Sequence, residues 1–167
     1  MEKNKGMTLI ELIVVIGIMG VVVGLIGLSF AVVSRQRLSS AASEVKGQFQ
    51  TAQTIALSKD DCFIKIEKNS DDEVVFTTCS AADIVLDTCI ISRKITVRIY
   101  EDGETTPIDL DHGAIIIKYI RQTGGFDYPR QGADELAKIT TISFARGNGE
   151  NEITLRLNKA TGKVSYE

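Results

Sequence analysis

The sequence predicts an α+β fold in which a long N-terminal helix packs on an antiparallel β-sheet domain. Three observations lead to this prediction. Residues 12–34 contain no charged side chain, and apolar residues then recur every three or four positions from Leu38 to Ala56. Short strand-like segments separated by turns fill the rest of the chain. The 167 residues are enough for one folded domain with an appended helix.

The apolar segment at residues 7–33 is long enough to cross a bilayer, which requires about 20 residues. It is longer than the core of a secretory signal, and no Ala-x-Ala-like site follows, so we expect a retained membrane anchor. A carboxylate inside a membrane segment costs free energy, so the presence of Glu11 near the start of this segment indicates a functional role. Four glycines allow either close helix packing or local deformation: Gly17, Gly20, Gly24 and Gly27.

Residues 34–59 continue the same helix with a different pattern. Apolar side chains recur at spacings of three and four with polar residues between them, which predicts an amphipathic helix with one apolar stripe. The stripe consists of Leu38, Ala41, Ala42, Val45, Phe49, Ala52, Ile55 and Ala56. A polar cluster that begins at Ser58 ends the helix after roughly 50 residues. The stripe needs a partner, which the following residues must supply.

Residues 60–167 form the β-rich domain of this prediction. Turn clusters rich in Gly, Asn and Asp separate its strands. The expected strands are 62–67, 74–79, 95–99, 114–120, 139–144 and 153–157. Because no second long helix follows, we expect an antiparallel meander.

The first two strands are expected to form a hairpin around the turn cluster 69–72. Pairing Lys68 with Glu73 gives a largely apolar face and places Cys62 opposite Cys79. The hairpin would therefore bring these two cysteines together.

The three cysteines leave two disulfide pairings open. Cys79 and Cys89 bracket a short excursion of the chain that a disulfide would close, and Cys62 competes for Cys79 through the hairpin. Either arrangement is compatible with the Cα separation that a disulfide needs, and we favour Cys79–Cys89. In a reducing compartment all three would stay buried thiols.

Residues that enzymes and metal sites require are scarce. His112 is the only histidine, so any Ser-His-Asp arrangement depends on this one residue. The neighbouring Asp109 and Asp111 lack the fuller ligand set of a calcium loop. We therefore expect a protein that is not an enzyme, with no catalytic residue, no metal, no cofactor and no small-molecule substrate.

Positive charge gathers near the C-terminus, where acidic residues interleave with it. The net charge of the chain is −3, so a mixed, solvated surface is favoured over a nucleic-acid groove. The basic residues are Arg146, Arg156, Lys159 and Lys163.

The segment from Gly6 to Glu11, with the apolar helix after it, resembles the N-terminus of type IV prepilins, including the pseudopilins of type II secretion. The family pattern is a short basic leader, a glycine, a hydrophobic residue, Thr-Leu-Ile-Glu and a long apolar helix. Met7 stands where phenylalanine is commonest.

This resemblance implies that residues 1–6 are a leader, removed by prepilin peptidase between Gly6 and Met7, and that the new amine of Met7 is methylated. Thr8 and Glu11 belong to the assembly motif, and in family members the glutamate pairs with the terminal amine of a neighbouring subunit. The leader would be cytoplasmic and residues 60–167 extracytoplasmic, first at the membrane and then in an extracellular or periplasmic filament. The implied fold is the type IV pilin fold.

The implied function is that of a structural subunit, minor rather than major, of a type IV pilus or a type II secretion pseudopilus. Its implied partners are other pilin or pseudopilin subunits, the prepilin peptidase/N-methyltransferase, the inner-membrane assembly platform and membrane lipid before assembly. The tail, with Ile142-Ser143-Phe144 and Thr161-Gly162-Lys163-Val164, is similar to the GspH/FimT group of minor subunits. Two alternatives remain: a DNA-uptake minor pilin that binds DNA through its globular domain, and a single-pass anchored domain that is never processed.

Overall fold

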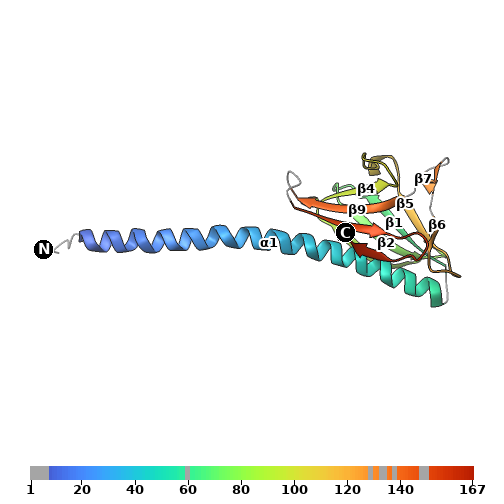
Figure 1. The fold of residues 1–167 in the computed structure, drawn as a ribbon, viewed down its shortest axis with the longest axis horizontal. Helices are drawn as coiled ribbons and strands as arrows, with labels where there is room; N and C mark the ends of the chain where they lie inside the picture. Colours follow the sequence, from blue (N-terminus) through green and yellow to red (C-terminus); the bar gives the residue numbers. More distant parts are fainter. Residues whose placement is uncertain (1–7, 59–60, 128–129, 132–134, 137–138, 147–150) are drawn as a thin grey trace. The chain divides into compact units, whose positions relative to one another are not determined.

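The computed structural model describes residues 8–58, 61–127, 130–131, 135–136, 139–146 and 151–167. The chain divides into two compact units, Met1–Arg37 and Leu38–Glu167. Helix α1 (Leu9–Ser58) comes first, and strands β1–β11 follow it in the sequence (Figure 1). The predicted α+β class is confirmed.

The larger sheet has five strands in the order β3-β2-β1-β5-β6, and each neighbouring pair is antiparallel. Its strands are β1 (Cys62–Lys68), β2 (Val74–Ser80), β3 (Val85–Ile91), β5 (Ile115–Tyr119) and β6 (Phe126–Asp127). No strand was predicted at β3, which forms one edge of this sheet.

A second sheet has four strands in the order β11-β10-β9-β4, again antiparallel. A short 3-10 helix, η1, and the pair β7–β8 complete the described elements. Their bounds are β4 (Thr96–Glu101), η1 (Leu110–His112), β7 (Arg130–Gln131), β8 (Glu135–Leu136), β9 (Ile139–Arg146), β10 (Asn151–Leu157) and β11 (Val164–Tyr166). The predicted meander is wrong at β4. This strand does not pair with β3, which precedes it in the sequence, but with β9 in the other sheet.

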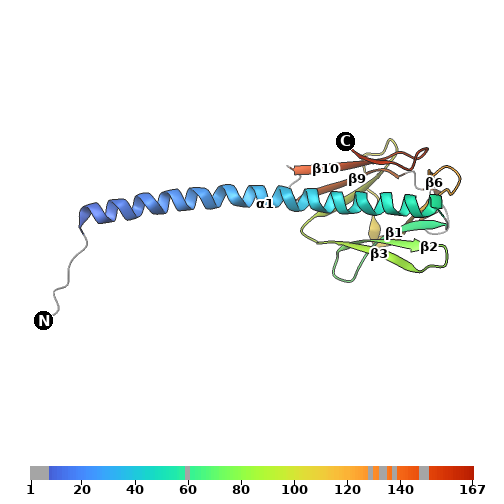
Figure 2. The ribbon, with the colours of Figure 1, turned by 90° about the horizontal axis from the view of Figure 1, so that it is seen from below.

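The core of the larger unit lies between both sheets and the part of α1 that begins at Leu38. In Figure 2 this part of the helix passes in front of β9 and β10 on one side and of β1, β2 and β3 on the other. The residues of the predicted stripe are buried or half-buried here, and Val45 and Phe49 are fully buried. The Phe49 ring packs edge-on against Phe126 at 6.0 Å, and Tyr119 donates its hydroxyl proton to the Phe49 carbonyl at 2.7 Å. The apolar stripe therefore finds its partner in the sheets.

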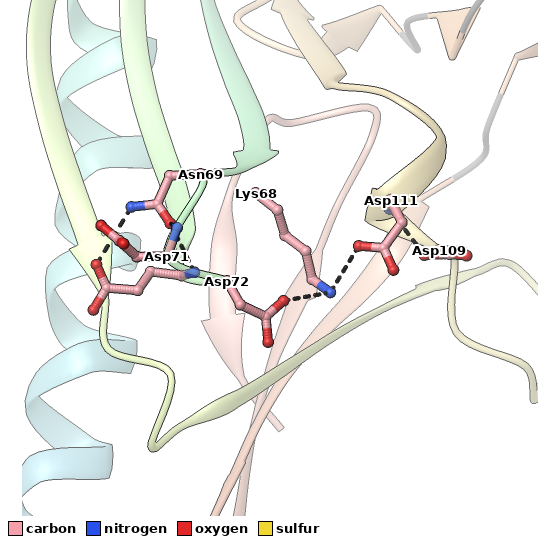
Figure 3. Close-up of polar contacts among 7 residues, drawn as sticks. Lys68, Asn69, Asp71, Asp72, Asp109 and Asp111 are labelled. Carbon is pink, nitrogen blue, oxygen red and sulfur yellow. Dashed lines mark hydrogen bonds and ion pairs between the residues drawn. The ribbon is translucent and has the colours of Figure 1, made fainter.

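The register of the β1–β2 hairpin differs by one residue from the predicted register. Lys68 lies opposite Val74, and Cys62 lies opposite Ser80 rather than Cys79. The Asn69 side chain accepts hydrogen bonds from the backbone N–H groups of Asp71 and Glu73, while Asp72 adopts a φ of 60° (Figure 3). With Asp72 in this left-handed conformation, the Asn69 N–H donates to the Glu73 carbonyl at 3.0 Å. Five residues rather than four therefore separate Lys68 from its partner, and the register shifts by one. The shift turns Phe76 into the core and leaves its neighbour Val75 half-buried.

Two turns of the larger unit are fastened to α1 by one glutamine. The Gln53 Nε2 group donates to the Gly124 carbonyl at 3.0 Å and to the Thr161 carbonyl at 2.7 Å. Gly162 is buried beside them with a φ of +65°, and a Cβ there would overlap the Gly124 carbonyl oxygen. These three segments meet through backbone atoms, which leaves no room for a side chain at position 162.

Candidate assembly motif at the start of helix α1

Thr8 and Glu11 hold each other at the first turn of α1. The Glu11 Oε2 atom accepts from the Thr8 backbone N–H at 3.1 Å and from the Thr8 hydroxyl at 3.2 Å. The Glu11 backbone N–H donates in return to the Thr8 hydroxyl oxygen at 3.3 Å. This reciprocal arrangement is a capping box, in which two N–H groups left without helical partners are satisfied. The Thr-x-x-Glu spacing is its known sequence signature, and no capping box was predicted from it.

The capping box fixes where the Glu11 carboxylate lies and which of its oxygens is used. A carboxylate at a helix N-terminus interacts favourably with the positive end of the helix dipole. Both bonds from Thr8 go to the same oxygen, Oε2. In the described part of the chain no hydrogen bond to the other oxygen, Oε1, is present, so this oxygen is open to a further donor. The predicted cleavage residues Gly6 and Met7 lie outside the described residues.

The first part of α1, from Leu9 to Val23, exposes its large apolar side chains. Leu9 is 76% exposed, and even the best covered of them, Val15, is 41% exposed. The exposed fractions of the other large apolar side chains from Ile10 to Val23 lie between these two values. A helix that is apolar on all sides requires apolar surroundings, either lipid or other helices.

The predicted membrane segment at residues 7–33 is only partly described, since residue 7 and the side chains of residues 25–33 lie outside the described set. Within the part that the structure does describe, no helical stretch combines the length and the apolar character needed to cross a membrane.

One of the acidic residues near His112, Asp111, is paired with a lysine. Asp109 accepts from the Asp111 backbone N–H at 2.9 Å and so caps η1. Lys68 contacts Asp111 at 2.9 Å and Asp72 at 3.0 Å (Figure 3). These hydrogen bonds, the one to Asp111 first, raise the pKa of Lys68. The side chain of His112 lies outside the described set, and among the described residues no three metal-ligating side chains gather.

The basic residues near the C-terminus are spread over the four-stranded sheet and its turns. Arg156 on β10 pairs with Glu167 at 3.7 Å, and both side chains are more than half exposed. Lys163 is exposed just before β11, and Lys46 of α1 lies 4.3 Å from the ring centre of Tyr166. Arg156 therefore has an acidic partner, and the nearby Lys46 an aromatic one, within the same unit.

All three cysteines are buried free thiols. Across the strands, Cys89 lies opposite Phe76 and Cys79 lies opposite Val85, so the predicted disulfide Cys79–Cys89 is not formed. The alternative with Cys62 fails because of the hairpin register described above. Burial raises the pKa of Cys62 to about 11 and, with Glu44 nearby, that of Cys89 to about 12. Burial also raises the pKa of Cys79.

We expect these thiols to react slowly with iodoacetamide in the folded protein. The thiolate is the reactive form, so at pH 8 a pKa of about 11 lowers the rate about 100-fold relative to the unfolded chain. Mass spectrometry after timed alkylation, with and without denaturant, measures this difference. The variant Ser70→Cys, with an exposed position in the β1–β2 turn, is the control and is expected to react quickly when folded.

The same pKa shifts make stability depend on pH. A thiol whose pKa is raised on folding binds its proton more tightly in the native state than in the unfolded chain. Its contribution to the free energy of unfolding is therefore complete below its unfolded pKa of about 9. As pH rises above 9, the unfolded chain ionises first, and stability is expected to fall. Equal unfolding free energies at pH 8 and pH 10.5 would contradict this expectation.

Comparison with known proteins gives one match. The prokaryotic N-terminal methylation motif matches residues 1–27, which include Thr8, Glu11 and the beginning of the apolar helix. No curated protein and no solved structure matches the chain. The observed helix and antiparallel sheets are compatible with a pilin-like fold. Together, the motif and the fold support a type IV pilin-like precursor.

Proposed function

We propose that this chain is the precursor of a structural subunit, not an enzyme, of a type IV pilus or a type II secretion pseudopilus. The observation that carries the proposal is the match of the methylation motif to residues 1–27. Prepilin peptidase would remove residues 1–6 and methylate the new amine of Met7. The type IV pilin fold and a minor position in the filament, in the GspH/FimT group, are part of this proposal. The tail that resembles this group supplies the adjacent strands β9, β10 and β11.

The geometry of the capping box supports a docking role for Glu11. The carboxylate of Glu11 is already oriented by Thr8, so less conformational freedom is lost when it binds a partner. The open oxygen Oε1 would accept a hydrogen bond from the terminal amine of Met7 in a neighbouring subunit. Neutralising the carboxylate in this way offsets the cost of placing it among apolar helices.

The exposed apolar residues of α1 support storage in a membrane before assembly. Lipid would cover the side chains from Leu9 to Val23 in the precursor, and the helices of other subunits would cover them in the filament. The leader would then be cytoplasmic and residues 60–167 extracytoplasmic. The inner-membrane assembly platform would move the subunit from one environment to the other.

The intact mass of the protein extracted from membranes tests the processing step. We expect co-expression with a prepilin peptidase to remove the mass of residues 1–6 and to add one methyl group. Tandem mass spectrometry is expected to place the methyl group on the amine of Met7. Expression without the peptidase is the control and is expected to give the unprocessed chain. An unprocessed Met1 chain in the presence of an active peptidase would overturn the proposed function.

A further inference from the structure

Two arginines follow the uncharged segment of α1. Arg35 and Arg37 are the first charged residues after Glu11 in the sequence, and both are exposed on the helix. The stripe that packs on the sheets begins at the next position, Leu38, whose side chain is buried. The two guanidinium groups therefore lie where the apolar part of the helix ends.

The length of helix between the charged residues matches the thickness of a bilayer. About 24 residue positions separate Glu11 from Arg35, which corresponds to about 36 Å of α-helix. The hydrocarbon layer of a bilayer is about 30 Å thick. A helix that crosses this layer, even at a tilt of about 20°, has room for both charges just outside it. In such a position Arg35 and Arg37 lie at the level of the lipid headgroups.

The two arginines point away from opposite sides of the helix. Residues two positions apart are separated by about 200° around an α-helix, so they do not face the same neighbour. A protein surface that contacts one side of α1 would reach only one of them. Lipid surrounds a membrane helix on every side, and phosphate oxygens match the planar fork of donors of a guanidinium group. The arrangement therefore fits the phosphates of surrounding lipids.

We propose that Arg35 and Arg37 bind the phosphates of lipid headgroups in the extracytoplasmic leaflet and so fix the depth at which α1 is stored. Their aliphatic stems lie along the apolar helix while their charged ends reach the headgroups. Glu11 lies at the opposite surface of the same bilayer. This inference rests on the membrane storage of the proposed function, and it adds the ligand and the residues that bind it.

Native mass spectrometry of the full chain in detergent tests the ligand. The probe is phosphatidylglycerol, and diacylglycerol with the same acyl chains is the lipid that lacks a phosphate. We expect phosphatidylglycerol to bind, and the double variant Arg35→Gln with Arg37→Gln to weaken this binding about 25-fold, or about fivefold for each arginine. Diacylglycerol that binds as tightly as phosphatidylglycerol would overturn the proposal.

Matched variants show whether the position of the charges matters. Arg93→Gln with Lys94→Gln removes two exposed charges from the larger unit and is expected to bind phosphatidylglycerol like the parent chain. Equal weakening by both double glutamine variants would refute a site at Arg35 and Arg37. Inorganic phosphate at the same concentration as the lipid is expected not to displace it. Displacement would identify free phosphate as the ligand and reject the headgroup.

The depth of the arginines is measured by tryptophan fluorescence, because the chain contains no tryptophan of its own. Gln36→Trp places the fluorophore between the two arginines, and Val22→Trp, near the middle of the uncharged segment, is the matched control. The vesicles contain phosphatidylcholine and phosphatidylglycerol. A quencher on the headgroup is expected to act more strongly at position 36, and a quencher in the acyl chains at position 22. The same order at both positions would contradict the proposed depth.

Lipid binding and processing are tested separately, because the lipid measurements use the unprocessed chain and need no peptidase. Loss of processing with phosphatidylglycerol binding retained would bear on the proposed function alone. Normal processing of a chain that binds this lipid no better than its double glutamine variant at Arg35 and Arg37 would reject the lipid site alone.

Discussion

Replacing Glu11 with alanine is expected to reduce incorporation into filaments by about 30-fold or more while leaving leader removal largely intact. Breaking a hydrogen-bonded charge pair that is shielded from water costs about 2–5 kcal/mol, because the remaining charge is left without a partner. Here the remaining charge would be the terminal amine of Met7. Quantifying the subunit in sheared filaments and in membranes, by immunoblot, measures incorporation, and intact mass measures processing. Normal incorporation of Glu11→Ala would exclude the docking role.

The structure provides controls that separate docking from capping. Glutamine retains an oxygen that accepts both hydrogen bonds from Thr8, so Glu11→Gln keeps the capping box and removes only the charge. Thr8→Ala does the reverse, since it removes the hydroxyl and keeps the carboxylate. We expect Glu11→Gln to fail in incorporation nearly as fully as Glu11→Ala, and Thr8→Ala to incorporate partially. If Thr8→Ala failed to enter filaments while Glu11→Gln entered them normally, the motif would act only by stabilising the start of the helix.

The long helix and its buried stripe were predictable because their signals are local and periodic. Residues such as Val45 and Phe49 recur on one face regardless of what lies opposite, so the burial of the stripe follows from spacing alone. The capping box was equally available, since Thr8 and Glu11 have the required spacing. The spacing does not specify, however, that both Thr8 donors share one oxygen of Glu11.

The sheet was harder to predict because its signals depend on distant partners. Strand β3 alternates only in its second half, because its first four residues are all exposed, and a bulge where Thr78 and Cys79 of β2 pair with it disturbs its register. No glycine marks the β1–β2 turn, so the sequence does not indicate the left-handed conformation of Asp72 or the register that goes with it. The pairing of β4 with β9 joins segments far apart in the sequence, and no local pattern specifies it.

Gly162→Ala is expected to be the most destabilising small substitution in the larger unit, lowering the free energy of unfolding by about 3–5 kcal/mol. Two costs add at this position. Alanine is strained at a φ of +65°, which accounts for about 1 kcal/mol. The larger cost is steric, because the new methyl group would overlap the Gly124 carbonyl oxygen and approach Gln53 Nε2 to 2.8 Å. To relieve this overlap, the backbone of the two turns must move apart. This movement breaks the hydrogen bonds from Gln53 that fasten both turns to α1.

Two glycines of the same unit separate these costs. Gly103 has a φ of +82° with no atom within 4 Å of the position that a methyl group would take, so Gly103→Ala is expected to show only the conformational cost, about 1 kcal/mol. Gly47 lies within α1 with equally open surroundings, so Gly47→Ala is expected to stabilise the protein by about 0.5–1 kcal/mol. Thermal unfolding of the full chain in detergent, followed by the near-ultraviolet circular dichroism of its tyrosines, ranks the three variants. If Gly162→Ala were no worse than Gly103→Ala, the close backbone contact between the two turns would not exist in solution. The ranking thus tests whether the turns carrying Gly124 and Gly162 meet at the helix, independently of the N-terminal motif.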